Sequence, residues 1–166
     1  MTNLTSLYMS LEECTTITNM ECIRDMLLRL TNLKTLQLNF ASLLSVNDEA
    51  LRVLQQGIRK LSHLTFLYLN FHRCWDISDD GISKLLEGIA FEKNLESLNL
   101  QFDWQKNLTG LSFNNMHQKL QNLKSLKSLI LNFEWCSSIT DECFKAFAEL
   151  ISKITDLERL SLNFGK

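Results

Sequence analysis

The stretch at residues 126–133, LKSLILNF, decides the fold because it returns with few changes along the whole chain. Its copies are LKTLQLNF from Leu33, LTFLYLNF from Leu64, LESLNLQF from Leu95 and LERLSLNF from Leu157, with a looser copy, LTSLYMSL, from Leu4. The leading leucines are spaced by 29, 31, 31, 31 and 31 residues. A fixed period in this range is typical of a solenoid, in which each repeat is one supersecondary unit. We therefore expect a single domain over residues 1–166, with repeats starting near residues 4, 33, 64, 95, 126 and 157.

Charge and hydrophobicity argue against several classes of protein. The formal net charge is -2 and the basic residues are scattered, so we expect neither nucleic acid nor a membrane surface as a partner. No stretch approaches the roughly 20 apolar residues that cross a bilayer. The N-terminus also lacks the basic and apolar segments of a secretion signal. These features predict a soluble, cytoplasmic protein.

The cysteines follow the repeats. Five cysteines are an odd number for a disulfide framework, and three of them share one repeat position: Cys14, Cys74 and Cys136. At the strand spacing of a parallel sheet, Cys74 and Cys136 would lie about 10 Å apart, which is too far for a disulfide. The sequence therefore predicts reduced thiols in the core, as in an intracellular protein.

Each repeat begins with the two-residue period of a short strand. Leu129, Leu131 and Phe133 alternate with Ile130 and Asn132. Alternate side chains point to opposite faces of a strand, so one face is expected to be buried and the other exposed.

A helix is expected in the second half of each repeat. Small polar residues that can cap a helix come first: Thr18, Asn47, Ser78, Thr109 and Thr140. Acidic pairs that complement the helix dipole follow three of them: Asp48 and Glu49, Asp79 and Asp80, and Asp141 and Glu142. Apolar residues then recur with helical spacing, as at Leu51, Leu54, Ile58 and Leu61. Two departures are expected: an early end of the third helix, where Glu92 breaks the apolar stripe, and an irregular first helix around residues 22–30, where the repeat is two residues short.

A strand followed by a helix and then by a parallel strand requires a crossover connection, which is right-handed in nearly every case. We therefore expect an α/β fold with about six parallel strands and about five helices. The repeated pattern LxxLxLxF, with CWDISD at residues 74–79 and CSSITD at residues 136–141, resembles leucine-rich repeats, most closely the ribonuclease-inhibitor-like and cysteine-containing subtypes. The resemblance implies a right-handed horseshoe solenoid, with the parallel sheet on the concave face and the helices on the convex face.

The residues between the strand leucines form columns across the exposed face of the expected sheet. One column consists of amides and a serine: Ser10, Asn39, Asn70, Gln101, Asn132 and Asn163. These side chains could hydrogen-bond to one another as a structural ladder, or they could serve as donors and acceptors for a partner. Aromatic and cationic groups gather in the third repeat, a combination that suits recognition of a protein or peptide. The candidate partner-binding residues are Phe66, Tyr68, Asn70, His72, Arg73, Asn99, Gln101, Asp103, Ile130, Asn132 and Glu134.

The tryptophans follow the strands. Trp104 and Trp135 share one repeat position, with Arg73 at the equivalent place, and Trp75 lies two positions further on. They are expected either to pack over the turn beside the cysteine layer or to rim a binding surface.

Catalytic and metal-binding patterns are not found in the sequence. His63, His72 and His117 occupy three different repeat positions, so they are not expected to converge on a metal or an acid-base pair. Cys74 lies two residues from His72, but the same cysteine position recurs in repeats without a histidine. We therefore expect no catalytic residue, no metal and no cofactor, and we interpret the cysteine as a core residue.

The sequence favours a noncatalytic protein-protein interaction module that binds a protein or peptide on its concave face. One alternative is a structural scaffold array, because the first and last strands lack capping segments and could stack on neighbouring chains, head to tail if the partner is identical. For the same reason we expect the chain to be a fragment of a longer array. A second alternative is a substrate-receptor segment of a ubiquitin ligase, which only the CxxITD resemblance suggests.

Overall fold

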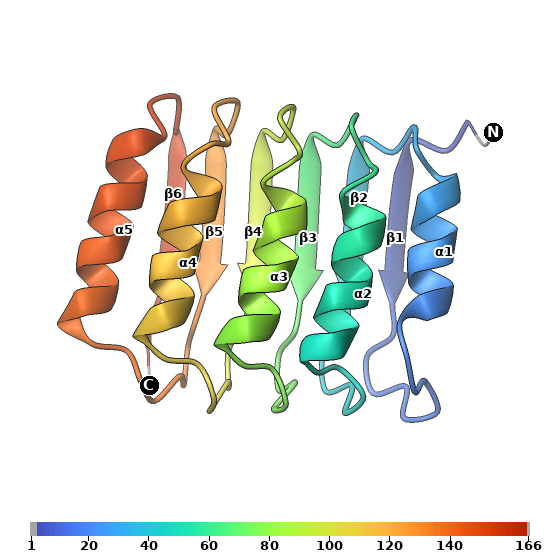
Figure 1. Ribbon diagram of the computed structural model, residues 1–166, viewed down its shortest axis with the longest axis horizontal. Coiled ribbons are helices and arrows are strands. Elements are labelled where there is room, and N and C mark those ends of the chain that lie inside the picture. Colours follow the sequence, from blue (N-terminus) through green and yellow to red (C-terminus); the bar gives the residue numbers. More distant parts are fainter. Residues whose placement is uncertain (1–2, 166) are drawn as a thin grey trace.

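The computed structural model describes residues 3–165, which form one parallel sheet of six strands and five helices (Figure 1). The elements alternate along the chain in the order β1 (Ser6–Ser10), α1 (Glu21–Arg29), β2 (Thr35–Asn39), α2 (Asp48–Ile58), β3 (Phe66–Asn70), α3 (Asp79–Ile89), β4 (Ser97–Gln101), α4 (Gly110–Leu120), β5 (Ser128–Asn132), α5 (Asp141–Lys153) and β6 (Arg159–Asn163). The expected α/β class is confirmed. Among these residues, no helix is long and apolar enough to cross a membrane.

The strands follow their sequence order across the sheet, and each is parallel to the next. Residues with the same repeat position lie side by side, as in the pairing of Leu67 with Leu36 on one side and Leu98 on the other. The register therefore equals the repeat period, and the predicted columns are neighbours across the sheet. The helices lie together on one face of the sheet and form the second layer of the molecule (Figure 1).

The core lies between the sheet and the helices. In β2 to β5 the second and fourth residues of each strand are buried, whereas the other three are half-buried. One phenylalanine in each repeat after the first closes this core just past the strand. Phe40, Phe71, Phe102 and Phe133 stack in a row with ring centroids 5.5, 5.3 and 5.8 Å apart. Burying these rings and the strand leucines removes apolar surface from water, which supplies most of the free energy of folding.

Four of the predicted caps are found at helix N-termini. The side chains of Asn47, Ser78 and Thr109 accept backbone hydrogen bonds from the first turns of α2, α3 and α4. Thr140 forms a capping box with Cys143 at the start of α5. The prediction for Thr18 is wrong, because α1 begins only at Glu21, after Met20.

The two expected departures from the repeat have different outcomes. The irregularity expected around residues 22–30 takes the form of a shorter helix, because α1 is a continuous α-helix of nine residues, against eleven in α2. The prediction that the third helix ends early is wrong, because α3 has the same eleven residues as α2 and α4. Glu92 lies beyond the helix, in a turn where its N–H donates to the carbonyl of Ile89 at 3.0 Å. Glu92 therefore places a carboxyl group at a core position in the turn after α3, and it does not shorten α3.

Candidate functional site

The face of the sheet opposite the helices carries the predicted binding residues. We call it the open sheet face and define it by the first, third and fifth residues of each strand, which in β3 are Phe66, Tyr68 and Asn70. These three side chains are half-buried by their neighbours, whereas Tyr8 on the edge strand β1 is 66% exposed. Burial and the nearby Tyr8 and Asp103 raise the pKa of Tyr68, so its phenol remains a neutral hydrogen-bonding group. The face combines aromatic area with polar groups.

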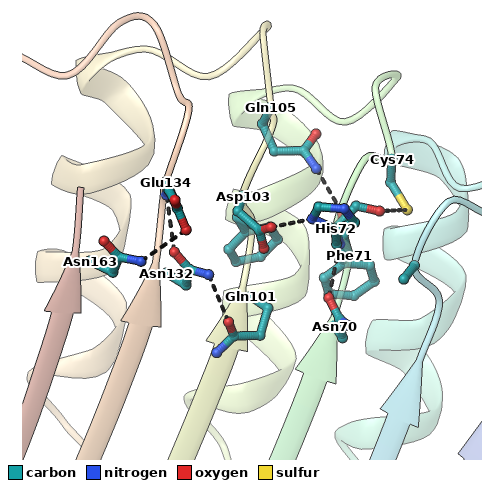
Figure 2. A network of polar contacts seen from close by, with 12 residues as sticks. Asn70, Phe71, His72, Cys74, Gln101, Asp103, Gln105, Asn132, Glu134 and Asn163 are labelled. Atoms are coloured by element: carbon teal, nitrogen blue, oxygen red, sulfur yellow. Dashed lines mark hydrogen bonds and ion pairs between the residues drawn. The ribbon is translucent and has the colours of Figure 1, made fainter. Parts of the chain in front are cut away.

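The strand pairing brings the candidate residues together in rows. The first row joins Tyr68, Asn99 and Ile130, and the second joins Asn70, Gln101 and Asn132. His72, Asp103 and Glu134 follow these strands at the same repeat position, where the strands end (Figure 2). Phe66 lies at the start of β3 beside Ser97. All eleven predicted residues thus lie on β3, β4, β5 or their exits, and Arg73, at the exit of β3, contacts Trp104 on the next loop.

The amide column has a structural role. In each of four repeats the asparagine Oδ1 accepts a hydrogen bond from the N–H two residues later, at Ala41 (3.1 Å), His72 (2.9 Å), Glu134 (3.0 Å) and Gly165 (3.1 Å). This bond turns the chain out of the strand. Asn132 also donates through Nδ2 to Oε1 of Gln101 at 3.0 Å (Figure 2). The oxygen atoms of the column therefore serve the fold, which supports the structural interpretation of the asparagines.

A row of carboxylates runs beside the amide column at the strand exits. Asn39 donates to Glu12 at 3.0 Å, and Asn163 donates to Glu134 at 3.2 Å. His72 replaces one acid of this row, and its Nδ1 contacts the carboxylate of Asp103 (Figure 2). Hydrogen bonds hold these side chains in fixed positions, which lowers the entropy that they would lose when a partner binds.

The tryptophans form a ladder along the loops. The rings of Trp104 and Trp135 stack with centroids 5.1 Å apart and planes at 24°, and the Arg73 guanidinium lies 4.9 Å from the Trp104 ring. All three residues adopt positive φ angles of 54 to 62°, which are uncommon for residues other than glycine. Trp104 is 38% and Trp135 47% exposed, so the stacked rings remain open to solvent. Packing over the turn beside the cysteine layer and lining the rim of a binding surface both stay predictions.

The cysteines near the site are core residues. Cys74 and Cys136 are free and buried, and their thiols donate to the carbonyls of Phe40 and Phe102 at 3.2 Å. Burial raises the pKa of Cys74 to about 12 and that of Cys136 to about 11, so neither supplies a thiolate nucleophile near neutral pH. The prediction of core thiols is confirmed for Cys74 and Cys136, whereas Cys14 at the same repeat position is only partly buried.

Gln105 occupies the cysteine position in the intervening repeat, a role that sequence reasoning missed. It is buried, and its Nε2 donates to the carbonyl of Phe71 at 2.7 Å (Figure 2). In these three repeats a side-chain donor therefore satisfies the phenylalanine carbonyl of the previous repeat, whereas Leu43 occupies the same position in the second repeat. The spacing of Cys74, Gln105 and Cys136 by 31 residues was the available signal.

Glu92 is the second residue that the sequence did not single out as a buried group. It replaces the buried leucine of other repeats, Leu61 or Leu123, and is itself only 1% exposed. Desolvation raises the pKa of its carboxyl to about 7, and its Oε2 has no hydrogen-bond partner. It lies in the turn between α3 and β4, away from the strand exits.

Within residues 3–165, no group of three or more histidine, cysteine, aspartate or glutamate side chains is arranged to hold a metal ion. His63 lies in the turn before β3 and His117 in α4, whereas His72 follows β3. The three histidines therefore stay apart, as their repeat positions predicted. Comparison of the chain with protein-family models and with curated proteins finds no match.

Proposed function

We propose that this chain is a leucine-rich-repeat solenoid that acts as a noncatalytic protein-interaction module and binds a protein or peptide on the open sheet face. In a horseshoe this face is the concave surface. One observation carries the proposal: the helices cover one face of a fully parallel sheet and leave the other open (Figure 1). Parallel sheets in proteins are nearly always covered on both faces, so this uncovered face is available to a partner.

The chemistry of the open sheet face supports a protein partner. Phe66, Tyr68 and Ile130 offer apolar and aromatic area at the centre of the sheet. Amides surround them, and the acids Asp103 and Glu134 lie at the strand exits. An apolar centre with polar groups around it is typical of protein-protein interfaces, in which a few central aromatic residues carry most of the binding energy.

A noncatalytic role is supported by how the reactive groups are used. The thiols of Cys74 and Cys136 are buried donors within the core. Asp48 and Asp79, two acids from the helix first turns, bind the caps of the following helices. His72 pairs with Asp103, and neither Cys74 nor Cys136 can act as a nucleophile beside them. The proposal therefore assigns these groups to folding and recognition.

Affinity capture with two matched variants tests the proposal. The first combines Phe66→Ala, Tyr68→Ala and His72→Glu on the binding side. The control combines Leu111→Ala with Lys145→Glu on the helix layer, where Leu111 is 63% exposed. Circular dichroism and thermal unfolding verify that both variants fold. We expect the first variant to lose the partners captured by the unaltered chain and the control to keep them. If both variants capture the same partners, the open sheet face is not the binding surface. If the unaltered chain captures only further copies of itself, head-to-tail stacking is favoured.

A further inference from the structure

The loops that follow the strands expose large apolar side chains. Leu44 is 63% exposed, Trp75 46%, Trp104 38% and Trp135 47%. Leu44 and Trp75 occupy one repeat position in successive loops, and Trp104 and Trp135 occupy another. We call these four side chains the loop-edge surface. Exposed apolar groups gathered on one side of a protein mark a surface that contacts something else.

The tryptophans of this surface are held in place before any partner arrives. Trp104 and Trp135 stack on each other, and Arg73 lies over Trp104. The carbonyl of Trp75 accepts a hydrogen bond from Asn107 at 2.8 Å, and the Lys106 ammonium lies 5.9 Å from its ring centroid. Binding would cost the rings of Trp104 and Trp135 little conformational entropy, and tryptophan is among the residue types enriched at binding hot spots.

The loops that carry this surface are acidic. Between strand and helix they hold five carboxylates, Glu12, Glu13, Asp76, Asp103 and Glu134, against two cations, Arg73 and Lys106, a net charge of -3 with His72 neutral. Within residues 3–165, no lysine or arginine forms an ion pair with any of the five acids. Both cations lie over tryptophan rings. Asp103 contacts His72, and the charges of the other four acids are left for a partner.

The surroundings of the loops strengthen this charge. The helices begin at the same edge of the molecule (Figure 1), and their first turns add further acids: Glu21, Asp48, Glu49, Asp79, Asp80, Asp141 and Glu142. The turns at the opposite edge, between helix and strand, hold six cations, Lys34, Arg59, Lys60, Lys93, Lys124 and Lys127, against four acids, Glu92, Glu96, Asp156 and Glu158. The molecule is thus acidic at the loop edge and basic at the other.

This charge decides between two occupants of an exposed tryptophan surface. Tryptophan and leucine also suit a membrane interface, but an acidic edge is repelled by anionic lipid headgroups. A basic polypeptide meets both requirements, because its cations complement the acids and its apolar side chains cover the tryptophans. We propose that the loop-edge surface binds a basic polypeptide segment in which lysine or arginine lies next to apolar residues. This goes beyond the function proposed above, since it concerns the loops and specifies the charge of the partner.

Selection from a displayed library of random peptides tests the inference. The unaltered chain is the bait, and affinities of the selected peptides are measured by fluorescence anisotropy. Four variants are compared: Trp104→Ala with Trp135→Ala, Glu134→Lys at the loop edge, Glu158→Lys at the opposite edge as the matched charge reversal, and Phe66→Ala with Tyr68→Ala. We expect the selection to enrich peptides that carry a net positive charge and contain apolar residues. The affinity of these peptides should fall by about tenfold or more in the double tryptophan variant and in Glu134→Lys, as for a lost hot spot. It should stay unchanged in Glu158→Lys and in the variant of Phe66 and Tyr68.

Several results would overturn the inference. These are no enrichment, enrichment of neutral or acidic peptides, or equal effects of Glu134→Lys and Glu158→Lys. Loss of binding only in the variant of Phe66 and Tyr68 would assign the peptides to the open sheet face and leave the proposed function standing. Tryptophan-dependent binding to vesicles of phosphatidylcholine and phosphatidylserine, without peptide binding, would identify a membrane surface instead. Because Glu134→Lys changes one half-buried side chain at a strand exit and leaves both tryptophans in place, the test holds even if the double tryptophan variant fails to fold.

Discussion

The carboxylate of Asp79 accepts hydrogen bonds from both the backbone N–H and the hydroxyl of Thr109, at 2.9 and 2.6 Å. Asp79 lies in the first turn of α3, whereas Thr109 caps α4. Asp48 makes the same two bonds to Ser78 one repeat earlier, at 2.8 and 2.6 Å. Each acid therefore links the start of its own helix to the start of the next, in addition to the contacts of the core.

Replacing Asp79 tests this link. Asp79→Ala leaves Thr109 and the buried Ser112 without their acceptor. Hydrogen bonds to charged groups contribute about 1.5 to 3 kcal/mol, so we expect the free energy of unfolding to fall by roughly 2 kcal/mol in urea titrations. Asp80→Ala is the control, since it removes the same charge from the same helix turn without removing this link. Similar losses in both variants would show that only the helix dipole matters.

The link is missing between α4 and α5, where it can be built. Gly110 occupies the position of Asp48 and Asp79 at the start of α4, and a Cβ atom there meets nothing within 4 Å. Gly110→Asp would place a carboxylate next to the cap of α5 at Thr140. We expect a gain of about 1 kcal/mol in the free energy of unfolding, from reduced freedom of the unfolded chain and from the helix dipole. Gly110→Ala should give only the first part of this gain, and an equal gain from alanine and aspartate would argue against a new link.

Glycine at the contact between α2 and α3 allows the helices to approach closely. A Cβ at Gly88 would lie 2.9 Å from the carbonyl oxygen of Gln55, and one at Gly81 would lie 2.9 Å from Cα of Asp48. Because these atoms belong to the backbone, a new methyl group must push the helices apart. Gly88→Ala should therefore lower the free energy of unfolding by about 1 to 3 kcal/mol, although alanine is the better helix former. Gly110→Ala is the matched control in open space, and an unchanged melting temperature in Gly88→Ala would contradict the expectation.

Glu92 makes stability depend on pH. In the unfolded chain this carboxyl ionises near its ordinary pKa of 4.5, whereas burial keeps it protonated up to about 7 in the folded protein. The unfolded state therefore loses its proton first, and the contribution of Glu92 to the free energy of unfolding falls as the pH rises through this window.

Substitution of Glu92 by leucine should remove this dependence, since Leu61 and Leu123 occupy the same position in neighbouring repeats. We expect Glu92→Leu to stabilise the protein by roughly 3 kcal/mol near pH 8 and by clearly less near pH 4, where the native carboxyl is neutral. Glu92→Gln is the control that removes the charge and keeps a polar group. Urea titrations at both pH values measure the stabilisation. If Glu92→Leu stabilises the protein equally at the two pH values, Glu92 does not titrate in this range.

Much of the architecture follows from the repeat. The spacing of Leu64, Leu95 and Leu126 by 31 residues predicted the strands, their parallel order and their register, because a constant repeat length makes each strand end level with the next. The columns of the open sheet face, and hence the proximity of Tyr68 and Asn99, followed from the same argument. The error over the third helix arose because a polar residue at a core position was taken as a break in the helix, whereas Glu92 lies after it.

The sequence by itself thus determined the number, order and register of the elements, since these depend on local periodicity and on a constant repeat length. Only the tertiary structure decided how side chains of successive repeats meet: Asp79 with Thr109, Arg73 with Trp104, and Gln105 with the carbonyl of Phe71. These contacts depend on backbone angles in the loops, such as the positive φ of Arg73 and Trp104, and on the direction in which each side chain leaves its repeat. Both are set by packing between residues about 30 positions apart, which no local pattern encodes.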